Sequence, residues 1–435
     1  MKPIQPPRGT RDFLPEDMIR RNYIFDTIKT VFERFGFQPM ETPAFESWEL
    51  LSKKGVGGTD VKNEIYYFKD KGDRELGLRF DLTAPMARVV ANNPQLPKPF
   101  KRYQIGRVWR YDRPQAGRFR EFWQADVDIV GSTSHQCELE CLSVAVNALT
   151  ALGFEKFKVK LNNRKILNGI IQCVGISEKK MDRVLRILDK LEKIGEKAVE
   201  KELMESGLTK TKALKLLKMV KVRGKPKDVL EREKKNLKGF IDAEEGIREL
   251  EKIVSDSKIY GIQNKIEIDL SLVRGLAYYT GPIFEIVVEA KKNVGSVAGG
   301  GRYDNLIELY GGKWTPAVGI SLGIERIYEI MLSEGMFKTT KTLTKVFVVS
   351  VDERLRNHAL LTAQALRNNG INTQIDLMGR SMKKQLEYIN SSGIPFVIFI
   401  GEKEFKEKLF TLKNMKTGKQ KKLTLDEIIK EIISK

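Results

Sequence analysis

Residues 100–131 read FKRYQIGRVWRYDRPQAGRFREFWQADVDIVG. Apolar and polar residues alternate at both ends of this stretch, which is typical of β-strands, and residues 112–118 form a polar break with Gly and Pro. The pattern predicts two antiparallel strands joined across the break. Because side chains alternate along a strand, Gln124, Asp126 and Asp128 are expected on one face of the second strand.

A sheet face with cations, an amide and carboxylates suits a small zwitterionic ligand. Arg can hold a phosphate or a carboxylate through two parallel hydrogen bonds, and Asp and Gln accept from ammonium or imidazole N–H groups. A solvated hairpin with cross-strand ion pairs would also explain these charges. It would not explain why they lie among Trp109, Phe119, Phe122 and Trp123.

Three further stretches carry candidate functional residues. They are DLSLVRGLAYYTGPIFEI at 269–286, VAGGGRYDNLIELYGG at 297–312 and AVGISLGIERIYEI at 317–330. Arg274 follows an apolar strand directly, and Arg326 opens a helix after another, so both are expected at strand ends. Three consecutive glycines let a backbone approach a ligand closely, although a tight turn is the commoner reason for such a run. The stretch matches neither of the two common glycine-rich nucleotide loops.

The rest of the chain divides into helix-rich and strand-rich parts. Apolar residues recur at helical spacing over 15–35, and LGLRFDLT at 76–83 predicts a strand that precedes a helix over 84–93. A charged, helix-period block interrupts strand-rich sequence, and the last part alternates strands with helices. We predict an α+β fold with a catalytic domain at 1–163 and 259–335, a helical insertion at 164–258, a linker at 336–344 and an α/β domain at 345–435.

Charge and composition restrict the function. The 435 residues include 77 Lys and Arg against 57 Asp and Glu, which gives a net charge of +20 and favours a polyanionic partner. Only two His are present, so His-based catalysis is disfavoured, and His135 with Cys137 and Cys141 supplies too few ligands for zinc. We expect buried helix residues there and no metal site. No secretory signal or membrane span is expected, which points to the cytoplasm.

Taken together, these motifs resemble the histidyl-tRNA synthetase family of class II aminoacyl-tRNA synthetases, in its archaeal and eukaryotic branch. The resemblance begins at RGTRDFLPED and covers nearly the whole chain. The three class motifs resemble GFQPMETPAFE (36–46), WRYDRPQAGRFREFWQADVDIVG (109–131) and VGISLGIERI (318–327), and the two histidine signatures resemble LVRGLAYYTG (272–281) and AGGGRYDNL (298–306). The resemblance implies a homodimer with the first motif at its interface.

The resemblance implies the activation of L-histidine by ATP, with Mg²⁺ accompanying the nucleotide, and transfer of the histidyl group to tRNA(His). Arg110 would hold the α-phosphate and the histidine carboxylate, Arg274 would replace a metal near the α-phosphate, and these two would be catalytic. Arg326 would hold the γ-phosphate. Arg118 would face ATP and the tRNA acceptor end, with Gln115 nearby.

The resemblance also implies a histidine site and an anticodon site. The histidine-binding residues would be Asp81, Thr83, Arg110, Gln124, Asp128, Arg274, Tyr278, Tyr279 and Tyr303. Asp81, Thr83 and Gln124 would take the α-amino group, and Asp128 and Tyr279 the imidazole. The α/β domain at 345–435 would bind the anticodon, with Arg380 and Lys383 as candidates.

The sequence differs from the family pattern at a few positions, and other functions are also compatible with it. Asp81 and Asp128 stand where bacterial members commonly have Glu, and Ala277 stands where the signature often has Asp. One alternative is a histidine-sensing regulatory paralogue that works with ATP phosphoribosyltransferase, a group that generally lacks the anticodon domain. Others are a tRNA-sensing domain of a stress kinase, a class II synthetase for proline, threonine or glycine, and a basic RNA-binding protein.

Overall fold

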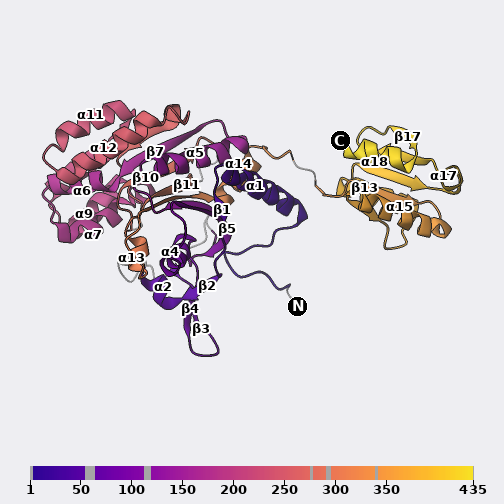
Figure 1. Ribbon diagram of the computed structural model, residues 1–435, viewed down its shortest axis with the longest axis horizontal. Coiled ribbons are helices and arrows are strands. Elements are labelled where there is room, and N and C mark those ends of the chain that lie inside the picture. The colour runs from indigo at the N-terminus through magenta and orange to yellow at the C-terminus, as the bar shows by residue number, and fades with distance from the viewer. Residues whose placement is uncertain are drawn as a thin grey trace. The chain divides into compact units, whose positions relative to one another are not determined.

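The computed structural model describes residues 3–53, 64–111, 119–274, 278–290, 295–338 and 341–434. The chain forms two units, each with its own sheet (Figure 1). Unit 1 comprises Met1–Arg11 and Ile24–Met336, and unit 2 comprises Asp12–Tyr23 and Phe337–Lys435.

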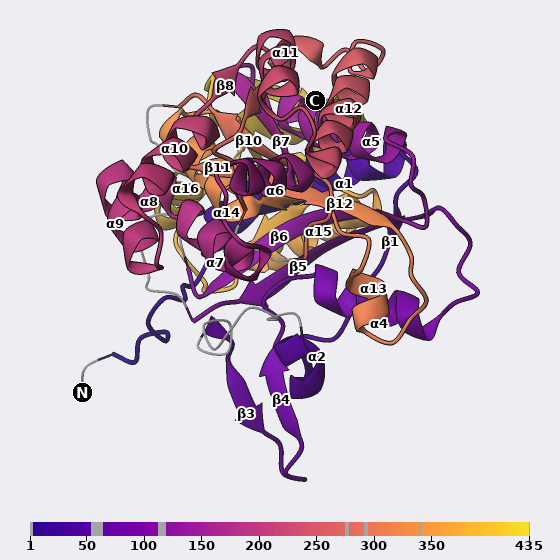
Figure 2. The ribbon, with the colours of Figure 1, turned by 90° about the vertical axis from the view of Figure 1, so that its left-hand side faces the viewer.

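A nine-stranded sheet forms the centre of unit 1 (Figure 2), with strand order β1-β5-β6-β12-β11-β10-β7-β9-β8. The strands are β1 (Gln38–Pro39), β5 (Phe100–Trp109), β6 (Glu121–Val130), β7 (Phe157–Asn163), β8 (Arg223–Gly224), β9 (Ile266–Asp269), β10 (Pro282–Val288), β11 (Ser296–Arg302) and β12 (Ala317–Gly323). The pairs β1–β5 and β7–β9 are parallel, and the remaining pairs of this order are antiparallel. The predicted hairpin is confirmed as β5 and β6.

One face of the large sheet is apolar and covered by helices. Val127, Ile320, Phe284 and Leu161 lie on this face at 0–2 % exposure, and Gly300 lies in register between Ile320 and Phe284. The covering helices are α5 (Gln136–Ala151), α12 (Ile241–Asp256) and α14 (Ile324–Ser333), which contact β6, β7, β10, β11 and β12. Their burial leaves the opposite face, called here the polar face, for the functional residues.

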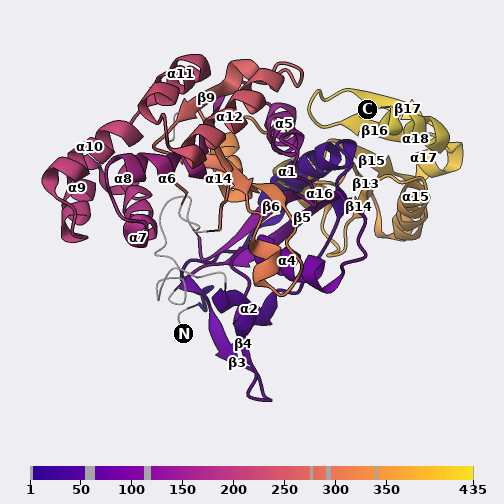
Figure 3. The ribbon, with the colours of Figure 1, turned by 60° about the vertical axis from the view of Figure 1, so that its left-hand side comes forward.

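The helix-rich part of unit 1 packs at the β8 end of the large sheet (Figure 3). Its helices are α6 (Arg164–Cys173), α7 (Glu178–Leu188), α8 (Leu191–Ile194), α9 (Glu196–Glu205), α10 (Lys210–Val220) and α11 (Pro226–Asn236). Lys212 and Lys215 donate to the carbonyls of Gly175 and Cys173 at the end of α6, at 2.5 and 3.2 Å. These two lysines therefore stabilise a helix C-terminus, where cations are favoured.

A small sheet with strand order β2-β4-β3 forms a separate layer of unit 1. It contains β2 (Phe45–Ser47), β3 (Tyr67–Lys69) and β4 (Glu75–Leu78), with α2 (Trp48–Lys53) beside it, and the β3–β4 hairpin extends away from the large sheet (Figure 2). The predicted strand over 76–83 is wrong beyond Leu78. Residues 79–82 leave the sheet, and α4 (Thr83–Asn92) follows them.

The first helix is confirmed as α1 (Pro15–Arg34), which begins with Pro15 and two acidic residues, as expected for a helix start. The short helix α13 (Leu306–Leu309) contacts α4. No helix in the described part of the chain is long and apolar enough to span a membrane.

Unit 2 has a five-stranded sheet with order β14-β13-β15-β16-β17, and it confirms the α/β architecture predicted for the C-terminal part. Its elements are β13 (Val346–Ser350), α15 (Arg356–Asn368), β14 (Thr373–Ile375), α16 (Met382–Ser392), β15 (Phe396–Ile400), α17 (Glu402–Glu407), β16 (Phe410–Asn414), β17 (Gln420–Leu423) and α18 (Leu425–Ile433). The strands β14, β13 and β15 are parallel, whereas β16 and β17 add antiparallel to them. Apolar side chains from β13 and β15 pack on both faces of this sheet.

Candidate functional site

The polar face carries two rows of residues that are in register across the strands. One row is Arg102, Asp128, Gly319, Gly301 and Ile283, and the other is Gln104, Asp126, Ser321, Gly299 and Glu285. Directly opposite residues of paired strands point to the same face, so each row is contiguous. The glycines at 299, 301 and 319, called here the glycine floor, leave space between the carboxylates of β6 and the acid of β10.

Functional side chains occupy the space above the glycine floor. A Cβ atom added at Gly299 would lie 1.7 Å from Nη1 of Arg274, and one at Gly319 would lie 2.0 Å from Oδ1 of Asp128. The glycines of the run are therefore explained by close approach, to a side chain at Gly299 and to backbone atoms of the neighbouring strands at Gly300 and Gly301. The expectation of a tight turn is wrong, because the three glycines lie inside β11.

Asp128 is held by a fully buried arginine and a buried tyrosine. Nη2 of Arg102 lies 2.5 Å from Oδ2 of Asp128, and the hydroxyl of Tyr303 donates to Oδ1. Burial, together with the charge of Asp128, raises the pKa of Tyr303 well above its usual value. The tyrosine therefore remains a proton donor to this carboxylate.

The segment that precedes α4 is pinned by two arginines of the hairpin. Nε of Arg110 donates to the carbonyl of Phe80 at 3.0 Å, and Nη2 of Arg102 donates to the carbonyl of Leu82 at 3.2 Å. Asp81 is buried and accepts from the N–H of Ala84 at 3.0 Å. Among the described residues, the carbonyls of Phe80 and Leu82 accept hydrogen bonds from arginine side chains and not from a neighbouring strand. The segment therefore leaves the sheet, and Asp81 lies just before the start of α4.

Gln124 and Asp126 continue the polar face of β6, as the alternation predicts. Nε2 of Gln124 donates to Oγ of Ser321 at 2.7 Å, and both Gln124 and Asp126 are buried. Burial raises the pKa of Asp126 to about 7, against the lowering effect of Arg102. Asp128 and Asp81 raise it further, so three carboxyl groups act on one another in this part of the site.

Arg274 lies over the glycine floor in a left-handed backbone conformation, with φ at +47°. Its Nη1 lies 3.1 Å from Oε1 of Glu285, and its Cζ lies 5.9 Å from the ring centre of Tyr279. Burial lowers the pKa of Arg274, but Tyr279, Glu285 and Tyr278 outweigh this effect and raise it. The group therefore keeps its positive charge in a largely dry site.

Three tyrosines form an aromatic wall beside Asp128. The ring centres of Tyr278 and Tyr279 are 4.6 Å apart, and Tyr278 meets Tyr303 edge to face at 5.7 Å. Burial raises the pKa of Tyr278 well above its usual value. The structure thus brings both histidine signatures and the second class motif to one place.

Arg110 and Arg326 lie at one end of the large sheet. Arg110 directly follows β5, and Arg326 lies in the first turn of α14 after β12. The strands β5 and β12 both run antiparallel to β6, so their last residues meet the same end of it. Arg110 lies 5.2 Å from the ring centre of Phe122, and Arg326 donates to the carbonyl of Ser296. Both arginines are partly exposed.

Some expected site residues fall elsewhere. Gln115, Arg118 and Ala277 lie outside the described residues. Arg380 and Lys383 belong to unit 2, where Arg380 pairs with Asp376 and lies 4.8 Å from the ring centre of Tyr388, and Lys383 is exposed.

The His and Cys cluster has structural contacts. His135 Nε2 lies 2.7 Å from Oδ2 of Asp256, which joins the start of α5 to the end of α12. Cys137 and Cys141 are buried, as predicted, and burial raises the pKa of both thiols. Within the described ranges, no group of three or more His, Cys, Asp or Glu is arranged to hold a metal.

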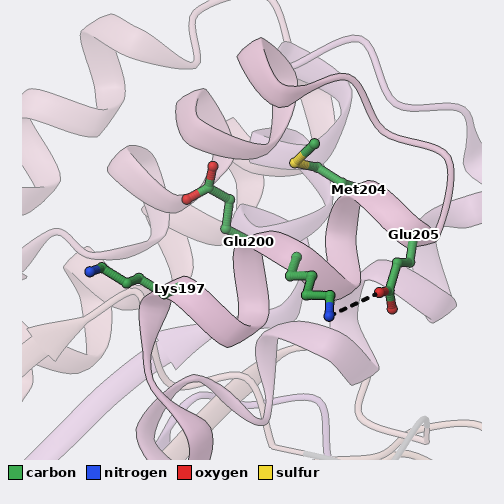
Figure 4. A pocket seen from close by; sticks show the side chains of 5 residues that line it. Lys197, Glu200, Met204 and Glu205 are labelled. Atoms are coloured by element: carbon green, nitrogen blue, oxygen red, sulfur yellow. Dashed lines mark ion pairs between the residues drawn. The ribbon is translucent and has the colours of Figure 1, made fainter.

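An open depression of about 500 Å³ lies on α9 (Figure 4). Its lining residues are Lys197, Glu200, Lys201, Met204 and Glu205. None of them comes from the polar face, and the ion pair across it, between Lys201 and Glu205, spans 3.9 Å. This depression is therefore separate from the candidate site.

Arg102 was missed by the sequence reasoning, although the sequence held a signal for it. Residue 115 is the centre of the polar break, and Arg102 and Asp128 are equidistant from it, so a symmetric hairpin pairs them. Glu285 was also missed, because its role depends on its register opposite Gly299.

Arg11 was missed for a different reason. Its guanidinium pairs with Glu325 on α14 and lies 3.8 Å from the ring centre of Phe119, and the carbonyl of Gly9 accepts from the N–H of Arg120. The N-terminal segment thus joins the second and third class motifs. The pairing spans 314 residues, and no local pattern indicates it.

A largely antiparallel sheet flanked by helices, with arginines at its end and a C-terminal α/β unit, is the architecture of a class II aminoacyl-tRNA synthetase. Comparison with known proteins agrees. Residues 9–327 match the histidyl-tRNA synthetase family, and residues 345–435 match an anticodon binding domain. The chain belongs to the histidyl-tRNA synthetase family.

Individual relatives support this assignment. The histidine–tRNA ligase of Aeropyrum pernix is 41% identical over 435 residues, which cover 98% of this chain and 97% of the relative. That of Cytophaga hutchinsonii is 40% identical over 451 residues, with 98% and 99% covered. The crystal structure of histidyl-tRNA synthetase from Nostoc sp. superposes with a TM-score of 0.85 at 32% identity and covers 100% of both chains.

Proposed function

We propose that the chain activates L-histidine with ATP, releases pyrophosphate, and transfers the histidyl group to the 3′-terminal adenosine of tRNA(His). The observation that carries the site assignment is the glycine floor, over which Arg274 and the Asp128–Tyr303 pair converge. Arg274 would be the cation for the two anionic reactants, ATP and the histidine carboxylate. Asp128 and Asp81 would be the acceptors for the imidazole and the ammonium group.

The histidine side chain would bind between Asp128 and the tyrosines. Asp128 accepts from one imidazole N–H, Tyr279 meets the other ring edge, and Tyr278 and Tyr303 line the pocket. Asp81, Thr83 and Gln124 take the α-amino group. A buried site that pairs both ring nitrogens rejects isosteres strongly, because an analogue leaves buried polar groups unpaired. The pocket therefore needs no separate editing domain.

The activation step joins two anions. A carboxylate oxygen of histidine attacks the α-phosphorus of ATP in line, and the bond to the bridging oxygen breaks as pyrophosphate leaves. Arg110 holds the α-phosphate and the carboxylate, Arg274 stabilises the charge that develops there, and Arg326 holds the γ-phosphate. Positioned cations lower the barrier by orientation and electrostatic stabilisation, so no nucleophilic side chain is required.

Mg²⁺ would accompany ATP. In the described part of the chain no group of three or more acidic, His or Cys side chains is arranged to hold a metal. Its ligands would therefore come from the phosphates together with single carboxylates, as is usual for this ion with nucleotides. It would supply charge neutralisation of the phosphates.

The remaining parts of the proposal concern tRNA and assembly. Gln115 and Arg118 would face the acceptor end, and Arg380 and Lys383 would contact the anticodon. We assign 1–163 and 259–335 to a catalytic domain, 164–258 to a helical insertion, 336–344 to a linker and 345–435 to the anticodon domain. The protein would act as a homodimer in the cytoplasm, where translation takes place.

Histidine-dependent ATP–pyrophosphate exchange without tRNA tests the proposal, with proline, threonine and glycine in parallel. Exchange with histidine alone is expected. Histidine binding without any exchange would instead indicate the regulatory paralogue. A crystal structure from Bacillus halodurans, described as an ATP phosphoribosyltransferase regulatory subunit/histidyl-tRNA synthetase, is 24% identical with a TM-score of 0.76 and therefore shows the fold alone.

Arg274→Ala tests the catalytic assignment. The variant should lose adenylate formation and keep its fold, because within the described residues the guanidinium pairs with a side chain, Glu285, above the glycine floor. Arg74→Ala, which removes an exposed arginine paired with Asp70, is the matched control. Near-normal exchange in Arg274→Ala would remove this residue from the mechanism.

A further inference from the structure

Arg102 is a fully buried cation inside the strand β5. Its exposure is 0 %, and it lies directly opposite Asp128 in the β5–β6 register. Burying a guanidinium is costly unless it is paired and hydrogen-bonded. Within the described residues its Nε and Nη1 atoms have no acceptor, and its Nη2 atom makes two contacts.

The first contact fixes the carboxylate that faces the imidazole. Nη2 of Arg102 forms an ion pair with Oδ2 of Asp128 while the hydroxyl of Tyr303 donates to Oδ1, so a charged or polar group faces each oxygen of the carboxylate. A carboxylate has lone pairs for about four hydrogen bonds, so capacity for a ligand N–H remains. Without the cation, the neighbouring carboxyl groups of Asp126 and Asp81 would repel the charge on Asp128.

The second contact reaches the other end of the substrate site. The same Nη2 donates to the carbonyl of Leu82 at 3.2 Å, and Leu82 stands between Asp81 and Thr83. One nitrogen atom therefore joins the segment for the α-amino group to the carboxylate for the imidazole. Arg110 also holds this segment, through the carbonyl of Phe80, but Arg102 contacts both the segment and Asp128.

We propose that Arg102 is a positioning residue for amino-acid selection, which sets the distance between the ammonium subsite at Asp81 and Thr83 and the imidazole subsite at Asp128. This inference rests on the proposed function. Arg102 acts through its neighbours, because its guanidinium is sealed from solvent. It selects ligands that carry an ammonium group and an imidazole at the spacing found in histidine.

The test compares variants of Arg102 with a matched control on the same strand. Arg102→Gln removes the cation, and Arg102→Lys keeps the charge. Arg102→Gln combined with Asp126→Asn also removes the neighbouring acid, which limits the uncompensated negative charge above about pH 7 if the single variant fails to fold. Lys101→Gln is the control, because Lys101 also joins a carboxylate to a carbonyl, Glu140 at 2.8 Å and Phe35 at 2.6 Å, from the opposite face of β5.

The readouts are the KM values for histidine and ATP in pyrophosphate exchange, and the Kd for histidinol by calorimetry. Histidinol has the ammonium and imidazole groups but no carboxylate. Histidine KM and histidinol Kd should rise about tenfold or more in the Gln variants, which is about 1.4 kcal/mol, while ATP KM stays within about twofold. Arg102→Lys should recover part of the loss, and Lys101→Gln should match wild type.

The outcomes separate this inference from the proposed function. Equal rises in the histidine and ATP KM values, or unchanged histidinol binding in the folded Gln variants, would overturn the positioning role. Absence of exchange in the wild type would instead overturn the proposed activity. Histidinol binding needs no turnover and would still test Arg102 in that case.

Discussion

The three glycines of β11 have different neighbours on the two faces of the sheet. A Cβ atom at Gly299 would meet the end of the flexible Arg274 side chain, whereas one at Gly300 would lie 2.0 Å from the carbonyl oxygen of Gly319 and 2.7 Å from Cα of Ile320. Side chains can move aside, but the backbone of a packed sheet cannot do so cheaply.

Gly299→Ala should therefore fold but displace Arg274, with at least about a tenfold loss of histidine-dependent exchange, equivalent to 1.4 kcal/mol in the barrier. Gly300→Ala should fold poorly, because its methyl group meets backbone atoms. Exchange rates and thermal unfolding midpoints of the two variants check both statements. Full activity in Gly299→Ala would contradict the placement of Arg274.

Asp126 should make stability depend on pH. Its pKa in the fold is about 7, above the usual 3.8, so the neutral carboxyl is favoured in the folded state. Its contribution is complete below about pH 4 and is lost as the pH rises through about 7. Asp126→Asn, which stays neutral, should gain stability relative to wild type over this window, by about 2–4 kcal/mol.

Urea unfolding followed by tryptophan fluorescence measures this difference at pH 5 and pH 8. All four tryptophans lie in unit 1, so the signal reports the unit that contains Asp126. Asp73→Asn is the control, because the side chain of Asp73 is 92% exposed. A difference that does not change between the two pH values would show that Asp126 titrates normally.

At this scale, the sequence predicted residues whose position follows from local patterns. Gln124 and Asp128 were placed on one face by alternation. The predicted position of Arg274 at a strand end is wrong, because β9 ends at Asp269 and Arg274 lies in the segment that follows it. The left-handed backbone of Arg274 could not be foreseen, because residues other than glycine rarely adopt this conformation.

At the scale of elements, a buried ion pair links α5 to β11. Nε and Nη2 of Arg302 donate to the two oxygens of Glu138 at 2.5 and 2.9 Å, and these side chains are 8% and 2% exposed. The carbonyls of Ser132 and Ser134 accept further bonds from the same guanidinium. This pair fixes the strand end that carries Tyr303.

Glu138→Ala should destabilise unit 1 by up to about 3–5 kcal/mol, because it removes the partner that takes two hydrogen bonds from a buried guanidinium and leaves, among the described residues, Asp304 at 3.2 Å as the single carboxylate partner. Glu140→Ala on the same helix should cost far less, since Glu140 and its partner Lys101 are 29% and 25% exposed. Urea midpoints from tryptophan fluorescence compare the two variants. Similar losses would mean that solvent reaches Arg302 in the fold.

Helices and strands were predicted correctly where they were long enough for the spacing of their apolar residues to repeat. The helix over 15–34 and the hairpin of β5 and β6 have twenty residues each in the structure, and their spacing predicted them. The strands β1 and β8 have two residues each and show no period, so only tertiary pairing identifies them. Residues 79–82 look like a strand but are held by arginines.

At the scale of the whole molecule, the net charge of +20 should make the affinity for tRNA depend on salt concentration. Affinity for tRNA(His) should fall by at least about tenfold between 50 and 200 mM salt, because bound phosphates release counterions. Fluorescence anisotropy of labelled tRNA measures the slope. Histidinol binding in the same buffers is the control, and a flat tRNA response would assign the charge another role.

The class of fold could be predicted from sequence, whereas the assembly of the site could not. The order of the motifs and the spacing of apolar residues indicated a helix-flanked sheet and a C-terminal α/β unit, which the structure confirms. The charge pairs that support the site join Arg11 to Glu325 and Arg302 to Glu138, across 314 and 164 residues. Such pairs depend on packing, which no local spacing records.

The glycine floor also limits how the pocket can be re-engineered. Glycine is the smallest residue, so no substitution can deepen the floor to admit a bulkier non-natural amino acid. Room for such a substrate would have to come from the walls, by shortening Tyr278 or Tyr303. Directed-evolution libraries for larger substrates should therefore randomise the tyrosines and leave the glycine codons fixed.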